Sequence, residues 1–112
     1  MDNLEEKINA FRDERDWRQF HNEKDLAISI SLEASELLEL FQWKSSEETI
    51  KTKRGEIEDE LADVMIYSMM LASNLDLDVE EIILNKLEKN NEKYPVEKSK
   101  KKKKKYTELD SL

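Results

Sequence analysis

The spacing of apolar residues predicts a chain made of helices. Leu4, Ile8 and Phe11 recur at helical spacing, and they follow an Asn-x-x-Glu capping box that begins at Asn3. A first helix is therefore expected to end near residue 15. Residues 16–24 form a polar and aromatic connector.

Apolar residues are densest between residues 25 and 43, where they predict a second helix that is mostly buried. A third helix is expected from about residue 55 to residue 73. The segment before it, Ser45 to Glu48, suits the cap of a helical turn. The apolar stripes consist of Leu26, Ile30, Leu37 and Phe41 in the second helix and Ile57, Leu61, Val64, Ser68 and Leu71 in the third.

Another capping box, Asp78 with Glu81, begins a fourth helix, which Tyr94-Pro95 ends. Four helices of this length predict an all-α fold, a four-helix bundle subunit. The second and third helices are apolar around more of their circumference than one small subunit can cover. The chain is therefore expected to oligomerise through helix faces, as a homodimer or a larger assembly.

Composition agrees with a small helical domain, because the 112 residues include one Gly, one Pro and no Cys, and 41% are charged. The formal net charge is −8, but seven of the 19 basic residues are Lys98 and Lys100 to Lys105. We therefore expect a helical domain over residues 1–97 and a Lys-rich tail over residues 98–112. The acidic body makes nucleic acid an unsuitable partner.

No apolar run approaches the roughly 20 residues that cross a bilayer, and the first residues lack the pattern of a signal peptide. A cytoplasmic protein without a membrane partner is expected. The absence of Cys excludes thiolate metal sites, and the single His21 cannot supply the repeated Glu-x-x-His pattern of di-iron bundles.

Two carboxylate pairs, Glu33-x-x-Glu36 and Glu60-x-x-Asp63, lie within apolar helical stretches. The spacing alone is weak evidence, because 27 acids in 112 residues often produce it by chance. The apolar setting is more informative, since carboxylates in a core need a proton or a cation. Their hard oxygens suit Mg²⁺ or Mn²⁺. Acids on a solvated helix face remain the alternative.

Cations held by carboxylates bind polyphosphates and activate water, so hydrolysis of a phosphoanhydride fits these residues. No Ser, Cys or His is arranged as a covalent nucleophile, and direct attack by water is simpler. Aromatic residues flank the second helix: Trp17 and His21 before it, and Trp43 at its end. Each Trp either stacks on a base or packs in the core.

The chain resembles the MazG-like superfamily of all-α nucleoside triphosphate pyrophosphohydrolases, which is defined by Glu-x-x-Glu followed by Glu-x-x-Asp. More narrowly it is similar to dCTP pyrophosphatases. That similarity extends over Glu14 to His21, Leu40 to Lys44, Glu60 to Tyr67, Asn90, Tyr94-Pro95-Val96 and Lys105-Tyr106-Thr107. These segments span nearly the whole chain and are more specific than the carboxylate spacing.

The resemblance implies hydrolysis of a deoxynucleoside triphosphate, with dCTP or modified dCTP favoured, to a monophosphate and pyrophosphate. It implies a dimer or a tetramer with sites at subunit contacts. One departure is Ile8, where the animal enzymes have a base-contacting histidine. By this resemblance the Mg²⁺ ligands and catalytic residues are Glu33, Glu36, Glu60 and Asp63, and the substrate-binding residues are Trp17, His21, Trp43, Tyr67 and Asn90.

Two other functions remain open from the sequence. Phosphoribosyl-ATP pyrophosphohydrolases use a related bundle and the same chemistry, although the two Trp segments argue against that substrate. A noncatalytic helical dimerisation module would instead leave the acids solvated.

Overall fold

The computed structural model describes residues 3–99, apart from the side chains of Lys98 and Ser99, and contains no strand in this range. The prediction of an all-α chain is confirmed. The chain divides after Asp76 into two compact units, which are described separately. Its elements are α1 (Leu4–Glu14), the 3-10 helix η1 (Trp17–Phe20), α2 (Glu23–Glu39), α3 (Ser46–Asn74), α4 (Val79–Lys93) and α5 (Val96–Ser99).

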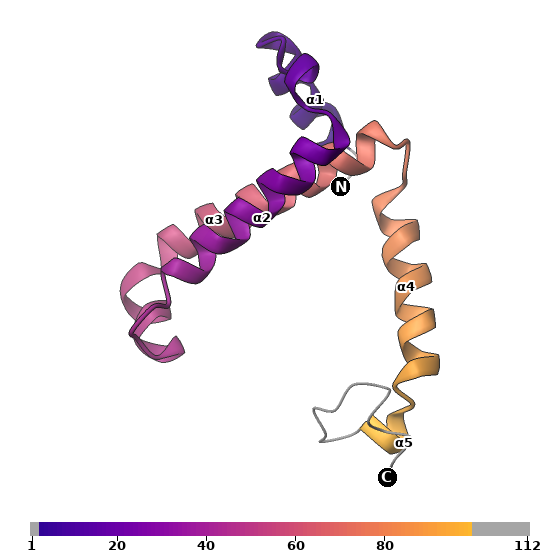
Figure 1. Cartoon of the computed structure of the whole chain (residues 1–112). Helices are drawn as coiled ribbons and strands as arrows, with labels where there is room; N and C mark the ends of the chain where they lie inside the picture. Colours follow the sequence, from indigo (N-terminus) through magenta and orange to yellow (C-terminus); the bar gives the residue numbers. More distant parts are fainter. Residues whose placement is uncertain (1–2, 100–112) are drawn as a thin grey trace. The chain divides into compact units, whose positions relative to one another are not determined.

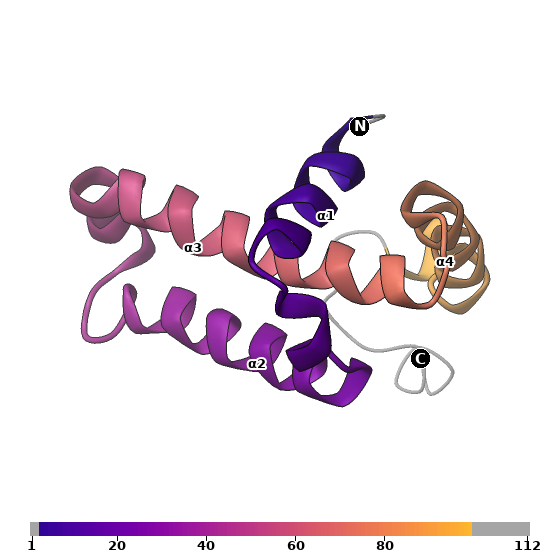
Figure 2. The ribbon, with the colours of Figure 1, turned by 90° about the horizontal axis from the view of Figure 1, so that it is seen from above.

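The first unit is built on α2 and α3, which lie side by side and antiparallel (Figures 1 and 2). Helix α1 packs against the C-terminal half of α3, and the buried core of this contact consists of Ile8, Leu26 and Met70. Three helices therefore meet at the end of the unit where α3 finishes. Burial of such apolar side chains is the main force that holds helices this short together.

Polar caps fix where the helices begin. The Ser45 hydroxyl oxygen accepts a hydrogen bond from the backbone N–H of Glu48 at 3.1 Å, and Asp78 accepts one from Glu81 at 2.9 Å. Both predicted caps are therefore present. The capping box predicted at Asn3 is absent, because the Asn3 side chain makes no cap hydrogen bond.

Two helix boundaries differ from the prediction. Helix α2 ends at Glu39 and does not continue to Trp43, whose φ of 62° is left-handed and cannot continue an α-helix. Helix α3 begins at Ser46, nine residues before the expected start, and contains one non-helical residue, Lys53. Residues 46–54, which the apolar pattern did not assign to a helix, thus form the first turns of α3.

The prediction that the second helix is mostly buried is wrong for the single chain. Only Leu26 of α2 is fully buried, while Leu32 is 59% and Leu38 67% exposed. On α3, Leu61 and Ser68 of the predicted stripe are also exposed. The four-helix bundle and its assembly through helix faces stay predictions, and the uncovered apolar surface is what such an assembly would bury.

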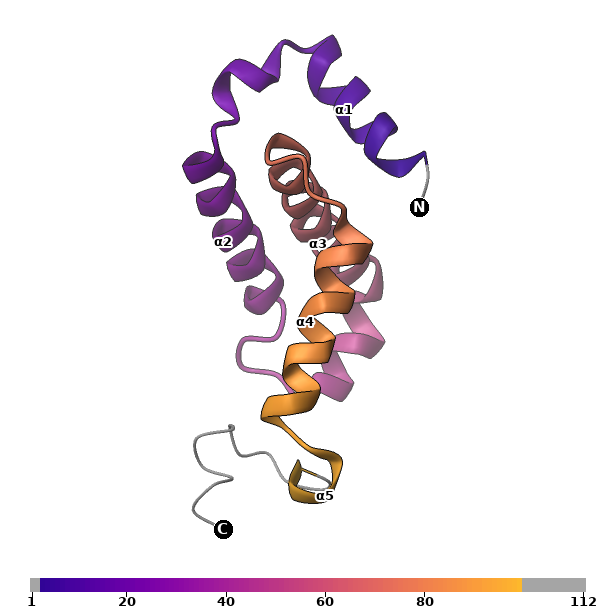
Figure 3. The same ribbon diagram turned by 90° about the vertical axis from the view of Figure 1, so that its right-hand side faces the viewer.

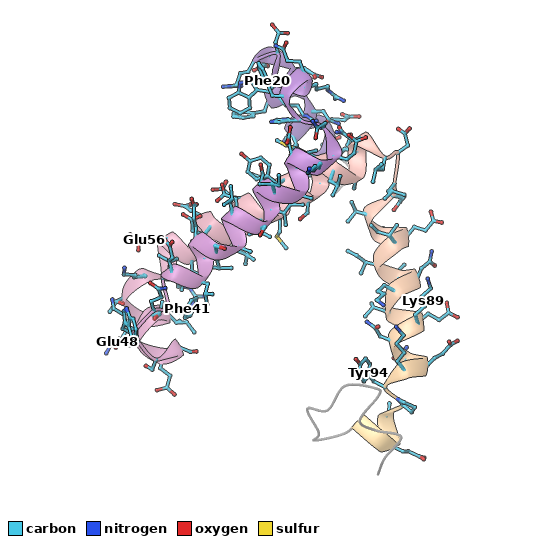
Figure 4. All side chains as sticks on the ribbon, viewed as in Figure 1. Phe20, Phe41, Glu48, Glu56, Lys89 and Tyr94 are labelled. Carbon is cyan, nitrogen blue, oxygen red and sulfur yellow. The ribbon has the colours of Figure 1, made fainter. Side chains whose placement is uncertain are left out.

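The second unit, as far as it is described, consists of α4 and α5. Helix α4 ends before Tyr94, whose backbone N–H donates to the Asn90 carbonyl at 2.8 Å, so the predicted stop at Tyr94-Pro95 is confirmed. Figure 4 shows Lys89 on this helix and Tyr94 just beyond its end. None of the described helices combines the length and apolar character needed to cross a bilayer. The lysine run Lys100 to Lys105 lies outside the described residues.

Candidate metal and nucleotide site

Three carboxylates meet where α2 and α3 pack together. One oxygen from each of Glu33, Glu36 and Glu60 lies within 4.8 Å of the other two. Glu33 and Glu36 lie one turn apart on α2, and the antiparallel α3 presents Glu60 to them. Three of the four predicted ligands are thus brought together by a single helix–helix contact.

The environment of this carboxylate group opposes its full ionisation. Desolvation, the neighbouring Glu36 and the charges of Asp63 and Glu60 raise the pKa of Glu33 to about 7. The pKa of Glu60 is also raised, first by desolvation and then by the neighbouring Glu36. Carboxylates that share one region cannot all be charged at neutral pH unless a cation joins them.

Asp63, the fourth predicted ligand, lies one turn after Glu60 on α3 but is not in the group of three oxygens. Its charge nevertheless helps to raise the pKa of both Glu33 and Glu60. The pKa of Tyr67, one turn further, is raised by desolvation and then by the charges of Glu33 and Asp63. Asp63 and Tyr67 therefore continue the acidic surface along α3.

The group has the features of a site for a hard divalent cation. The Oε2 atoms of Glu33 and Glu60 are buried and have no hydrogen-bond partner among residues 3–99. Buried polar atoms without partners are rare unless a ligand serves them. Oxygens at about 2.1 Å from Mg²⁺ on opposite sides are about 4.2 Å apart, so three oxygens within 4.8 Å fit one such ion with small adjustments.

A line of aromatic rings approaches this acidic surface from η1. The Trp17 ring packs edge-on against Phe11 at 5.5 Å and against His21 at 6.0 Å between centroids, and His21 packs against Tyr67 at 6.5 Å. Figure 3 shows how η1 carries the chain from α1 into α2. The line joins α1, η1 and α3, and it brings Trp17, His21 and Tyr67 of the predicted substrate residues together.

Within this line His21 is half-buried, and its Nδ1 has no hydrogen-bond partner among the described residues. Desolvation and the nearby charge of Arg12 lower the pKa of His21. Both effects favour the neutral imidazole, whose ring lies nearly perpendicular to that of Tyr67.

Trp43 is not brought to the aromatic line. It follows the C-terminus of α2, whereas Trp17 precedes the N-terminus, and a helix of 17 residues is roughly 25 Å long. Figure 4 shows the same separation between Phe20 of η1 and Phe41, which lie at opposite ends of α2. Trp43 is 98% exposed. Asn90 lies on α4 in the second unit.

Two polar residues beside this region were not identified from the sequence. Arg12 is fully buried, and Asn74, at the end of α3, binds both Arg12 and the backbone of His21. Arg12 is four residues after Ile8, so it continues the buried stripe of α1. That position was the available signal, although arginine side chains are seldom fully buried.

The model of the MazG-like family matches residues 28–109, which include all four predicted metal ligands. The chain belongs to this family.

Among its relatives are dCTP pyrophosphatase 1 of Mus musculus and of Homo sapiens, each 38% identical over 104 residues. These matches cover 88% of this chain, which spans only 61% of the length of either relative. Among solved structures, a pyrophosphatase from Archaeoglobus fulgidus is 43% identical with a TM-score of 0.80, covering 85% of this chain and 92% of that one. The Archaeoglobus fulgidus protein therefore shares the fold of this chain over most of its own length.

Proposed function

We propose that this protein is a Mg²⁺-dependent nucleoside triphosphate pyrophosphohydrolase that removes unwanted deoxynucleotides, with dCTP or a modified dCTP as the favoured substrate. The observation that carries the proposal is the group of Glu33, Glu36 and Glu60, with two buried carboxylate oxygens that lack partners. Membership of the MazG-like family and the likeness to dCTP pyrophosphatases support the substrate class.

In this proposal Glu33, Glu36 and Glu60 hold the ion, and Asp63 completes the ligand set. When bound there, Mg²⁺ or Mn²⁺ would supply positive charge that neutralises charge developing at phosphorus and would lower the pKa of the attacking water. A carboxylate of the group accepts the proton of the water as its oxygen bonds to the α-phosphorus. The bond to the leaving pyrophosphate breaks, which yields the nucleoside monophosphate.

The aromatic line supplies the surface for the nucleotide. Trp17 is 39% exposed although it contacts the rings of Phe11 and His21, so its accessible part offers an aromatic surface on which a base can stack. Tyr67 contacts the His21 ring and is influenced by the charges of Glu33 and Asp63, so it connects the aromatic line with the acids, where sugar or phosphate would pass. Asn90 is assigned to sugar or phosphate by resemblance alone.

The distance between Trp17 and Trp43 bears on the assembly. One base cannot touch both rings in the same copy, because the length of α2 separates them. The proposed base pocket therefore combines Trp17 of one copy with Trp43 of another, within a homodimer or homotetramer. The uncovered side chains of Leu32 and Leu38 provide apolar surface for that contact.

A panel of nucleotides incubated with the purified protein and Mg²⁺ tests the proposal. We expect pyrophosphate release from dCTP or a modified dCTP, and its loss in Glu36→Gln and Asp63→Asn, which keep the shape of the ligand but remove its charge. Absence of turnover for every nucleotide, or full rates in both variants, would overturn the assignment. Turnover of phosphoribosyl-ATP alone would instead favour the related histidine-precursor enzyme.

The noncatalytic dimerisation module is disfavoured by the buried oxygens of Glu33 and Glu60, because a solvated acidic face would leave neither atom buried. The cytoplasmic location, the lack of nucleic-acid binding and the domain boundaries at residues 97 and 98 stay predictions.

A further inference from the structure

The most unusual residue outside the carboxylate group is Arg12 on α1. Its side chain is fully buried, and no ion pair among the described residues includes it. Its Nε atom is buried without a partner among residues 3–99. A guanidinium removed from water without a paired carboxylate is costly, and apolar replacements of buried charges often stabilise a fold. Stability alone therefore does not explain this residue.

The guanidinium donates instead to three uncharged oxygens, two of which are at the end of α3. It donates to Asn74 Oδ1 at 2.9 Å, to the Met70 carbonyl at 3.5 Å and to Asn9 Oδ1 at 3.3 Å. The Asn74 contact is the shortest of the three. Two of these three acceptors belong to α3, so Arg12 ties α1 to that helix.

Asn74 also forms a hydrogen bond with the aromatic segment, residues 17–21. While its oxygen accepts from Arg12, its Nδ2 donates to the backbone carbonyl of His21 at 2.7 Å. A hydrogen bond from a charged donor polarises the amide and strengthens the bond that the amide donates. The carbonyl held in this way belongs to the residue whose ring lies between Trp17 and Tyr67.

We propose that Arg12 and Asn74 are positioning residues for nucleotide binding: through the His21 carbonyl they hold the Trp17–His21 segment in register with Tyr67 and the carboxylates. This inference rests on the proposed function for its kinetic consequence, but not for its structural one. Other contacts of this segment, Arg18 with Asp13 and Trp17 with Phe11, tie it to α1, and η1 contains no buried residue. The Asn74 hydrogen bond ties the end of the segment to α3.

The chain offers a matched control at the same end of α3. The Asn9 side chain donates to Ser73 Oγ at 3.0 Å, which also ties α1 to α3 but does not reach His21. Ser73→Ala removes this hydrogen bond and keeps the Asn74 bonds to Arg12 and His21, although Asn9 itself also accepts from Arg12. If the Asn74 bonds served helix packing alone, losing them and losing the Asn9–Ser73 bond would have similar effects on KM. A positioning role predicts that only loss of the Asn74 bonds raises KM.

Asn74→Asp is the principal test variant. Its carboxylate would face the Arg12 guanidinium, so the fold keeps its α1–α3 tie, but the donor to the His21 carbonyl is lost. We expect a melting temperature at or above that of the wild type and a KM for the nucleotide raised about tenfold, with kcat changed less than about twofold. Ser73→Ala should leave KM unchanged.

Arg12→Met is the second variant, and it removes the charge while keeping volume in the core. It should raise KM to a similar extent, and the double variant with Asn74→Asp should be no worse than the more impaired single variant, because both break one connection. Loss of cooperative melting in both single variants would make the network a folding determinant and overturn the positioning role.

Trp17 fluorescence provides a readout that needs no activity. In a Trp43→Phe background, used only for this measurement, Trp17 is the single tryptophan. Asn74→Asp should raise its quenching by acrylamide up to about twofold, since Trp17 starts at 39% exposed, whereas Ser73→Ala should not. If the wild type hydrolyses no nucleotide, the proposed function fails while this measurement still decides the inference. Unchanged quenching in Asn74→Asp, or a reduced kcat at constant KM, would overturn it.

Discussion

Glu33 on α2 and Glu60 on α3 belong to one group of carboxylate oxygens within 4.8 Å, yet each buries its Oε2 atom without a hydrogen-bond partner among the described residues. Desolvation raises the pKa of both, and their shared neighbour Glu36 adds to it. Without a cation, a retained proton relieves the repulsion between them. With a cation, the same oxygens are ligands, so proton and ion compete for one place.

Removing one of these charges should separate stability from function. We expect Glu33→Gln to raise the melting temperature of the metal-free protein at pH 8 by relieving repulsion, while pyrophosphate release falls at least about 100-fold. The stabilisation by Mg²⁺ should disappear at the same time. Thermal melting with and without the ion measures both effects.

Glu58→Gln is the matched control for this experiment, since it makes the same change on α3 at an exposed acid that pairs with Arg54 at 4.0 Å. It should retain the response to Mg²⁺. Equal losses in the two variants would show that overall charge, and not the group around Glu33, controls ion binding.

Ion binding should depend on pH because the pKa of Glu33 is raised from 4.5 to about 7. The folded carboxyl keeps its proton to a higher pH than the unfolded one. Its contribution to stability is therefore fully present below about pH 4.5 and is lost as the pH rises through about 7. The metal-free protein should melt at a lower temperature at pH 8 than at pH 6.

Mg²⁺ should have the opposite pH dependence, because it binds the deprotonated group. Its increase of the melting temperature should be larger at pH 8 than at pH 6, and calorimetry should detect proton release on binding near pH 6. In Glu33→Gln the pH dependence of both effects should be weaker. A response to Mg²⁺ that is the same at both pH values would contradict this linkage.

The separation of Trp17 and Trp43 predicts complementation between copies. Trp17→Ala and Trp43→Ala should each raise KM strongly. When the two variants are mixed and allowed to exchange, a heterodimer contains one pocket with both rings. Random pairing makes half of the dimers mixed, so about a quarter of wild-type activity should return at low substrate concentration. No recovery after confirmed exchange would place each pocket within one copy.

The buried position of Ile8 predicts a cost for placing a histidine there. Ile8 is only 8% exposed and packs with Leu26 and Met70, so an imidazole there would lose hydration without an evident partner. We expect Ile8→His to reduce the free energy of unfolding by about 2–4 kcal/mol without lowering the KM for dCTP. Ile8→Val, which should cost about 1 kcal/mol in chemical denaturation, is the control.

Much of the fold follows from local pattern. The caps at Ser45 and Asp78 and the stop at Tyr94 depend on residues within four positions of one another, and each is found as predicted. Helix α3 begins earlier than the sequence predicts because its first turns are polar. Polar turns on a surface lack the helical spacing of apolar residues from which a helix is predicted.

The sequence by itself determined that this chain is helical, that it belongs with MazG-like proteins, and which four acids deserve attention. Helical period and motif spacing are local properties, so residues three or four apart reveal them. The tertiary structure decided that Glu60 joins Glu33 and Glu36, that Trp17 and Trp43 lie at opposite ends of α2, and that Arg12 is buried.

Those three outcomes depend on how α1, α2 and α3 pack, which places residues far apart in the chain within a few ångströms. Burial also changes the chemistry of a residue without changing its type. The pKa of the Glu33 carboxyl is raised from 4.5 to about 7, because desolvation and the neighbouring like charges act only after folding has brought the helices together.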